Sequence, residues 1–293
     1  MLSALVAFAA CSTSPSSSSS ERTVYSRATP VYIPPPVAAN PSYASSLWPA
    51  NAPLIHAASA ILIDARTGRT LYQKNADQHR QVASTQKLLT GLIIAEREPL
   101  DEKITIQWSD TRVEPTKLGL RSGDRYTRRE LLESIMVKSS NDATAALARE
   151  HAGSIPAFAA EMNRVAASLG ANDSYFVNPH GLPGEQFSTA RDIARIAYRA
   201  YRNRILRQMM MKETVVFRHN SGRVSRLKAT NKLLARSPIY NGMKTGNTNA
   251  AGRCLVTSAS AGGRDLILVQ LGSKTKYIFD DAEKMIRWGL SKS

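Results

Sequence analysis

Cysteine is nearly absent from this 293-residue chain, which holds only Cys11 and Cys254. Two thiols cannot supply the three or four ligands of a typical zinc site, and the five histidines include no His-x-x-x-His pair. We therefore expect no metal, and nothing in the sequence calls for a cofactor. Cys254 precedes the apolar pair Leu255-Val256 and is expected to be a small buried residue rather than a reactive thiol.

Acidic residues are also scarce, because 23 aspartates and glutamates face 39 lysines and arginines, which gives a formal net charge of +16. Such a balance is typical of proteins that bind nucleic acid, membranes or acidic polymers. Aromatic residues make up only 6% of the chain, and no run of them lies between basic residues to stack on bases. We expect no nucleic acid. Anionic cell-wall polymers and lipid headgroups are better candidates, and solubility alone is the simpler explanation.

The apolar run from Leu2 to Ala10 is too short to cross a bilayer as a helix and is of signal-peptide type. It ends in small residues followed by Cys11, as the cleavage site of bacterial lipoproteins does, although no lysine or arginine precedes it. Residues 1–11 are thus expected to be a signal peptide with Cys11 lipidated. The alternatives are an ordinary secreted protein and no export. The first reading places the protein in the periplasm or at the cell envelope, held to a membrane by lipid.

Residues 12–56 are predicted to be a disordered tether, because Ser12 to Pro53 is rich in Ser, Pro and Ala and has little apolar content. Folded sequence is expected over 57–293. A β-hairpin is predicted over 60–73 with Gly68 in its turn, and a last helix over 280–288. Between them we expect helices at 84–98, 129–136, 142–152, 155–169 and 189–210, then strands at 214–218, 241–244, 251–259 and 265–271.

Strands at both ends with helices between them predict an α+β fold, in which the two termini complete one antiparallel sheet beside an all-helical lobe. In the helix predicted over 189–210, arginines recur on one face as a stripe. The stripe is interpreted as a solvated surface, with a contact to an anionic polymer as the alternative. Its members are Arg191, Arg195, Arg199 and Arg202.

Ser84 and Lys87 lie three residues apart at the start of a predicted helix, so their side chains share one face. The arrangement gives a serine hydroxyl an amine within reach and a helix N-terminal N–H to receive an oxyanion. Lys87 would act as a base only when neutral, and its pKa must then fall by about 3 units. Burial and a second cation, for which Lys244 is the candidate, would both lower it.

Ser139 and Asn141 lie in the predicted link between two helices, where a serine can relay a proton and a carboxamide can hold a substrate peptide group. Lys244, Thr245 and Gly246 begin a predicted edge strand. Glycine there leaves room for a peptide to pair along the strand, and the lysine and threonine can bind a terminal carboxylate. The backbone N–H of Asn247 would complete the oxyanion hole. Alone, each short motif is weak, but together they match acyl transfer through a serine ester.

Five segments carry a resemblance to the D-alanyl-D-alanine carboxypeptidases, the low-molecular-mass penicillin-binding serine peptidases. They are Arg80 to Thr90, Ser139 to Ala143, Asn178 to Leu182, Ser188 to Asp192 and Lys244 to Gly252. The resemblance covers about 57–290 and implies a β-lactamase-like fold with a five-stranded antiparallel sheet. It implies peptidoglycan stem peptides as substrate, acylation of Ser84, release of the terminal D-alanine, hydrolysis by water, and covalent trapping by β-lactams. We expect a monomer.

Three other functions remain open at this stage. Short family members include D,D-endopeptidases, which cut cross-links, and groove width cannot be predicted from sequence. A β-lactamase would need a deacylation base, and no Glu-x-x-Leu-Asn segment separates the second and third motifs. A non-catalytic wall-binding protein could retain the fold. His180 suggests a Ser-His-Asp site, but without a G-x-S-x-G elbow it is interpreted as structural.

Overall fold

The structure is a computed structural model that describes residues 49, 51–96 and 99–292. Cys11, the predicted signal peptide and the predicted tether up to residue 48 lie outside the described residues. Among the helices that are described, none combines the length and the apolarity needed to cross a bilayer.

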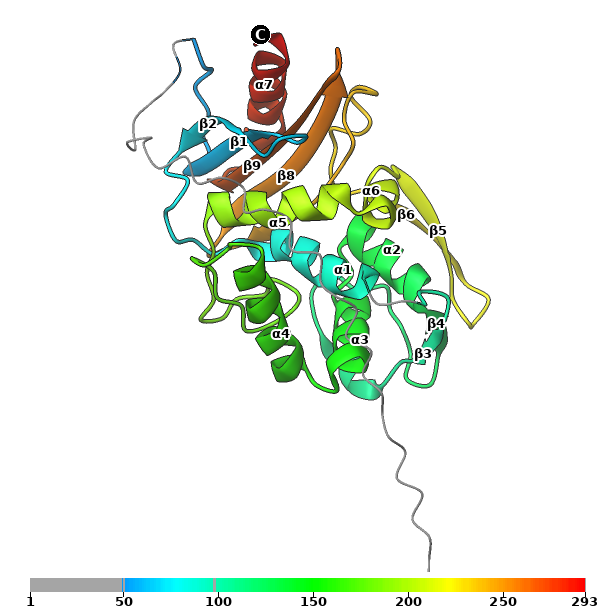
Figure 1. The fold of residues 1–293 in the computed structure, drawn as a ribbon. Helices are drawn as coiled ribbons and strands as arrows, with labels where there is room; N and C mark the ends of the chain where they lie inside the picture. The colour runs from blue at the N-terminus through cyan, green and yellow to red at the C-terminus, as the bar shows by residue number, and fades with distance from the viewer. Residues whose placement is uncertain (1–48, 50, 97–98, 293) are drawn as a thin grey trace, which may run out of the picture. The chain divides into compact units, whose positions relative to one another are not determined.

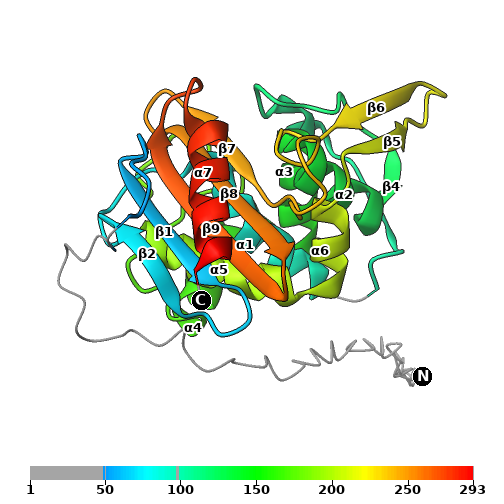
Figure 2. The ribbon, with the colours of Figure 1, turned by 90° about the horizontal axis from the view of Figure 1, so that it is seen from above.

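A five-stranded antiparallel sheet forms one half of the molecule, with strands in the order β2-β1-β9-β8-β7 (Figure 2). The two ends of the chain meet in it, because β1 from the N-terminal hairpin pairs with β9 from the C-terminal one. The sheet contains β1 (Ser59–Asp64), β2 (Thr70–Lys74), β7 (Thr245–Thr248), β8 (Gly252–Ala261) and β9 (Arg264–Ser273). This topology confirms the predicted α+β architecture and its sheet completed by both termini.

Helices cover both faces of the sheet and build the other half of the molecule. They are α1 (Lys87–Ala95), α2 (Arg128–Lys138), α3 (Asn141–Ala152), α4 (Ile155–Ser168), α5 (Ala190–Arg202), α6 (Arg204–Met210) and α7 (Ile278–Ser291). Figure 2 shows α7 lying across one face of the sheet, over β8 and β9, while α5 packs on the other face. Two 3₁₀ helices, η1 (Ala83–Gln86) and η2 (Trp108–Arg112), precede α1 and follow β3.

The helical half is not entirely helical, since it carries two short antiparallel ribbons beside α2 (Figure 1). One ribbon pairs β3 (Lys103–Thr105) with β4 (Arg125–Thr127), and the other pairs β5 (Thr214–Arg218) with β6 (Val224–Lys228). The strand at β5 was predicted. The three other strands are short or have a mixed pattern of burial, so no apolar alternation marks them.

The single helix predicted over 189–210 is two helices. Thr189 caps α5 by accepting from the N–H of Asp192, as expected. At Asn203 the backbone becomes extended, and its side-chain oxygen accepts from the N–H groups of Ile205 and Leu206. Asn203 therefore ends one helix and caps the next, which its preference for N-cap positions explains.

The predicted strand at 241–244 is also displaced, because the regular edge strand β7 begins at Thr245. Residues 241–244 do pair with β8 through Asn241 and Lys244. However, Gly242 and Met243 have φ angles of 80° and 83°, and two consecutive left-handed residues interrupt a regular strand. The two left-handed residues bend the chain just before β7.

The arginine stripe on α5 is not a solvated face. Arg191, Arg195 and Arg199 form ion pairs with Asp77, Asp192 and Glu96, and their side chains are 22%, 14% and 20% exposed. Arg202 stacks over the Tyr198 ring. Arg191 and Arg199 thus attach α5 to other segments, whereas Arg195 and Arg202 contact residues of α5 itself. The interpretation of the stripe as a solvated surface holds for exposed Arg202 and was wrong for the other three arginines.

The folded domain begins before the predicted boundary at residue 57. Ala52 and Ile55 are buried in a core cluster between the sheet and α7. His56 stacks on the Tyr277 ring and approaches the Asp281 carboxylate at 3.0 Å. The last residues assigned to the tether are therefore part of the domain.

Candidate active site

Ser84 lies in the 3₁₀ turn η1, between the sheet and the helical half. The preceding residue, Ala83, has a left-handed φ of 48°, which is rare outside glycine. Two glycines make this turn possible, because a Cβ on Gly181 would stand 2.0 Å from the Ala83 carbonyl oxygen and one on Gly246 2.9 Å from the Ser84 nitrogen. The serine is thus held by two close backbone approaches that only glycine permits.

Lys87 begins α1, one turn beyond Ser84, and is completely buried. Its Nζ is 3.0 Å from Ser84 Oγ, 2.7 Å from Asn141 Oδ1 and 2.8 Å from the His180 carbonyl oxygen. Ser84 Oγ also donates to that carbonyl, at 3.2 Å. The predicted pairing of hydroxyl and amine at i and i+3 is therefore present, and two further acceptors orient the amine.

Both site lysines are buried, and burial opposes their positive charge. Burial, reinforced by the charge of nearby Lys244, holds the pKa of Lys87 well below its usual range. Burial also lowers the pKa of Lys244 to about 7. The directions agree with the expectation that Lys87 rests as a neutral amine.

Asn141 and Ser139 come from the junction of α2 and α3. Ser139 ends α2 in the left-handed conformation, with φ 69°, and Asn141 starts α3. The Asn141 side chain accepts from Lys87 and donates to the Glu114 carbonyl at 3.1 Å. Ser139 lines the same groove as Ser84.

The edge strand β7 turns half of its backbone groups away from the sheet. Lys244 and Val256 exchange both of their backbone hydrogen bonds, which fixes the antiparallel register between β7 and β8. By alternation, the N–H and C=O groups of Thr245 and Asn247 face the open side of the strand. Since β7 is the last strand of the sheet on that side, these groups are available to an extended peptide.

An open groove of about 520 Å³ runs between β7 and the helical half. Ser84, Ser139, Thr245, Gly246 and Asn247 line it. Lys87, Asn141 and Lys244 are buried, and Lys87 and Asn141 are linked to Ser84 by hydrogen bonds. The Lys244 amine donates to the Thr245 carbonyl at 3.0 Å. The eight residues predicted from three separate motifs thus gather around one groove.

Two contributions to the site were missed from sequence. The His180 carbonyl accepts from both the nucleophile and the base, whereas its ring is buried, and burial together with the charge of Lys87 lowers its pKa to about 3. Asp142 accepts from the N–H groups of Leu118, Gly119 and Leu120 and so fixes the loop that carries the other wall of the groove. In the sequence, the only sign of these two residues was that His180 and Asp142 lie in the segments 178–182 and 139–143, which carry the family resemblance.

Cys254 is buried on β8 beside the groove, as predicted. Burial raises the pKa of its thiol to about 11. A thiol with so high a pKa holds almost no thiolate at neutral pH, so it is a packing residue.

Comparison with known proteins agrees with this geometry. A D-alanyl-D-alanine endopeptidase of Escherichia coli is 32% identical over 244 residues, which cover 82% of this chain and 79% of that protein. A D-alanyl-D-alanine carboxypeptidase of the same species is 35% identical over 81% of this chain and 62% of its own length. The crystal structure of a D-alanyl-D-alanine carboxypeptidase from Mycobacterium tuberculosis superposes with a TM-score of 0.80 at 29% identity, covering 86% of this chain and 97% of that one.

The model of the D-alanyl-D-alanine carboxypeptidase family matches residues 48–275, which include every residue of the groove named above. The match spans most of the chain, and the fold and the arrangement of the three motifs agree with it. The chain belongs to the D-alanyl-D-alanine carboxypeptidase family of serine peptidases.

Proposed function

We propose that this protein is a serine-type D-Ala-D-Ala carboxypeptidase that removes the terminal D-alanine from peptidoglycan stem peptides through an acyl-enzyme on Ser84. The observation that carries the proposal is the buried Lys87 amine, which lies 3.0 Å from Ser84 Oγ and 2.7 Å from Asn141 Oδ1 at an open groove. Its depressed pKa suits it to take the serine proton at neutral pH.

Acylation begins when Ser84 Oγ attacks the carbonyl carbon of the peptide bond before the last D-alanine and passes its proton to Lys87. The substrate pairs along the open edge of β7. The N–H groups of Ser84 and Asn247 receive the oxyanion, and Lys244 and Thr245 bind the terminal carboxylate. Support for this assignment comes from the register of β7, which turns the Asn247 N–H to the open side.

The leaving amine needs a proton as the C–N bond breaks. We assign the relay to Ser139, which gives its proton to the amine and regains one from protonated Lys87, so that Lys87 is neutral again; Asn141 holds the substrate's peptide group. The acyl-enzyme then reacts with water. Lys87 takes the water's proton, the ester C–O bond breaks, and Ser84 recovers its hydroxyl, so a hydrolytic cycle closes without another reactant.

The decisive experiment incubates the purified protein with a pentapeptide ending in D-Ala-D-Ala and follows free D-alanine. The native protein should release it, whereas Ser84→Ala and Lys87→Met should not. A penicillin adduct on Ser84, found by mass spectrometry, should be absent from Ser84→Ala. D-alanine release that persists in Ser84→Ala would overturn the proposal.

A D,D-endopeptidase is the second candidate, because the chain covers more of the E. coli endopeptidase, 79%, than of the E. coli carboxypeptidase, 62%. Digestion of purified sacculi separates the two activities. Loss of one alanine from monomeric stems supports the carboxypeptidase, whereas conversion of cross-linked dimers to monomers supports the endopeptidase.

The acyl-enzyme formed with a β-lactam should persist. The same Lys87 serves both half-reactions, and the deacylation base of a β-lactamase was not found in the sequence. A fluorescent penicillin should therefore stay bound for minutes. Rapid turnover would favour a β-lactamase, and failure to label Ser84 would favour a non-catalytic wall-binding protein.

We further propose that the protein is an exported monomer, attached to a membrane by lipid on Cys11 and extended from it by the tether before the folded domain. The proposal rests on the small residues before Cys11 and on the Ser- and Pro-rich composition that follows. Radiolabelled palmitate should be incorporated into the native chain and not into Cys11→Ala. Sedimentation of the protein without its lipid tests the monomer.

A further inference from the structure

A second, smaller hollow lies at the tip of the β5–β6 ribbon, outside the residues assigned to catalysis. It has a volume of about 90 Å³ and is lined by Gly119, Arg121, Asp124, His219, Ser221 and Arg223. With a share of about 30 Å³ per water, it holds roughly three waters. A carboxylate or phosphate group fits such a space.

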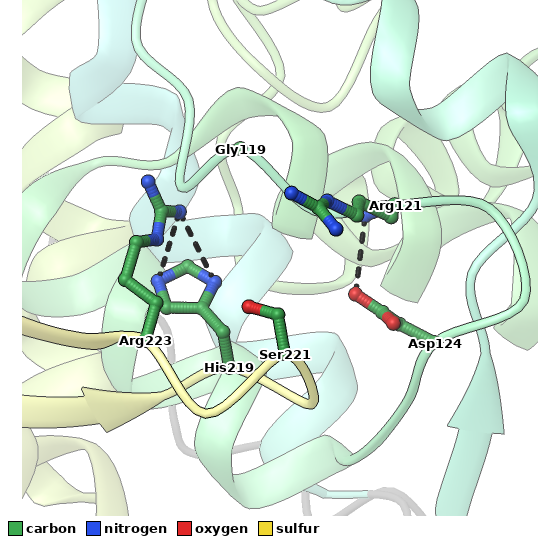
Figure 3. Close-up of a pocket in the computed structure, with 6 residues that line it drawn as sticks. All are labelled: Gly119, Arg121, Asp124, His219, Ser221 and Arg223. Atoms are coloured by element: carbon green, nitrogen blue, oxygen red, sulfur yellow. Dashed lines mark hydrogen bonds between the residues drawn. The ribbon is translucent and has the colours of Figure 1, made fainter.

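Positively charged and donor groups surround this hollow. Figure 3 shows the Arg121 and Arg223 guanidinium groups and the Ser221 hydroxyl around the same space. Arg223 is held by a hydrogen bond to the Leu118 carbonyl at 2.9 Å and by its approach to the His219 ring at 3.0 Å. One guanidinium is thus fixed in place, with its remaining N–H groups free to face a ligand.

The one carboxylate among the lining residues already has donors. Asp124 accepts from the Tyr126 hydroxyl at 3.0 Å and from the Arg121 backbone N–H at 3.2 Å. Among the lining residues, two guanidinium groups therefore accompany one carboxylate. His219, 6% exposed, bonds to Ser225 Oγ through its ring and closes the floor.

Both walls of the hollow continue into the catalytic groove. The loop that carries Arg121 begins at Pro115 and Thr116, which line the groove. On the other side Arg223 directly precedes β6, and the last residue of β6, Lys228, also lines the groove. At about 3.3 Å per residue, Arg223 and Lys228 are roughly 16 Å apart. A peptide of about five extended residues spans that distance.

The segment that links the hollow to the groove through β6 is rich in basic residues. From Thr214 to Arg264 the sequence contains no aspartate or glutamate, while lysine and arginine recur throughout. Arg226 and Lys228 alternate with buried Leu227 on β6 and are exposed. An anionic chain that leaves the groove along β6 passes the positive charges of Lys228 and Arg226.

We propose that this hollow is a subsite for a free carboxylate of a peptidoglycan peptide that extends from the groove along β6. The inference rests on the proposed function and deepens it, since it makes long, carboxylate-bearing wall peptides the preferred substrates. Phosphate groups of other wall polymers share the same chemistry, and the experiment distinguishes them.

Arg121→Gln is the test variant, because its exposed side chain lies at the hollow and not in the groove. Arg125→Gln is the matched control, since it removes the same exposed charge from β4, outside the lining residues. A long stem peptide with free carboxylates, its amidated form and a short acyl-D-Ala-D-Ala peptide serve as substrates. Arg121→Gln should raise KM about fivefold for the free-carboxylate peptide alone, as loss of one partly exposed charge pair would. Arg125→Gln should change none of the three.

Binding to Ser84→Ala, measured by calorimetry, separates this proposal from the proposed function. The Ser84→Ala/Arg121→Gln protein should bind the long peptide about fivefold more weakly than Ser84→Ala, whether or not the native protein cleaves it. Equal binding by the two proteins, or an equal loss for the amidated peptide, would overturn the subsite. A third outcome would assign the hollow to phosphate instead. In that case millimolar inorganic phosphate would compete with the peptide, the competition would disappear in Arg121→Gln, and free and amidated peptides would bind equally.

Discussion

Gly246 lies directly against the backbone of the nucleophile: a Cβ at this position would stand 2.9 Å from the Ser84 nitrogen and 2.9 Å from the Ala83 Cβ. Strand β7 and the turn η1 therefore touch through backbone atoms. The two N–H groups proposed for the oxyanion hole, of Ser84 and Asn247, belong to these two segments, and their separation depends on this contact.

Gly246→Ala should separate the two segments by a few tenths of an ångström or more. We expect acylation by a penicillin to slow by about 100-fold, because small misplacements of reacting groups are that costly. Stopped-flow labelling measures the rate. Gly91→Ala on α1 is the control, since its Cβ would meet the flexible end of Met136. An unchanged rate in Gly246→Ala would contradict the role of this contact.

Lys244→Met should stabilise the fold at neutral pH. In the folded protein burial lowers the pKa of Lys244 to about 7, whereas in the unfolded chain it is near 10.5. Between these values the unfolded chain binds the extra proton, so the free energy of unfolding falls as the pH falls from 10.5 to 7. Removing the amine relieves at most about 5 kcal/mol, less the lost hydrogen bond to the Thr245 carbonyl.

Urea denaturation at several pH values checks the predicted direction of this pH dependence. The gain of Lys244→Met over the native protein should be largest at pH 7 and shrink toward pH 10. Lys103→Met, at an exposed lysine on β3, should show no such trend. A gain that is the same at every pH would mean that packing, and not the proton, is responsible.

Lys244→Gln should also shift the pH dependence of acylation. The pKa of Lys87 is depressed by burial and by the charge of Lys244, and acylation requires the neutral amine. Acylation therefore falls as the pH falls through the pKa of Lys87. Without the neighbouring charge that pKa rises, so the acidic limb of kcat/KM against pH should move to higher pH. A limb that stays in place would remove Lys244 as the perturbing group.

Much of this site could be predicted because its signals are local. The spacing of Ser84 and Lys87 fixes their shared face, and the hairpin at 60–73 has its glycine in the turn with φ 77°. The predicted boundary errors also have local causes, namely the cap at Asn203 and the left-handed pair before Thr245.

The long-range contacts could not be predicted in this way. The His180 carbonyl reaches Lys87 across 93 residues of sequence, and a backbone acceptor leaves no mark on residue type. The charge pattern on α5 was misread for the same reason, since Asp77 is 114 positions from Arg191. The type of a residue gives the sign of its charge, but the residue with which it forms an ion pair depends on the fold.

Asp142→Asn should weaken the groove wall. Its Oδ1 accepts from Leu118 and Ala143, and its Oδ2 from Gly119 and Leu120. Replacing either oxygen by NH₂ leaves two N–H groups without that acceptor, at least one of them buried. We expect the free energy of unfolding to fall by about 3 kcal/mol.

Urea denaturation measures this loss, and penicillin acylation should slow about tenfold as the loop carrying Pro115 and Thr116 shifts. Asp173→Asn, at a carboxylate 60% exposed, should leave both quantities unchanged. If Asp142→Asn lost stability but acylated at the native rate, the loop would not position substrate.

Ser139→Ala tests the proton relay through the leaving group. An amine is a poor leaving group unless it is protonated in the transition state, whereas a thiolate leaves without a proton. We therefore expect Ser139→Ala to slow acylation by a D-Ala-D-Ala peptide by roughly 100-fold or more, as loss of a general acid does. Acylation by the corresponding thioester should change far less. Ser140→Ala is the control, since that neighbouring hydroxyl is buried and donates to the Ser134 carbonyl. Equal losses on peptide and thioester would mean that Ser139 shapes the groove and does not carry the proton.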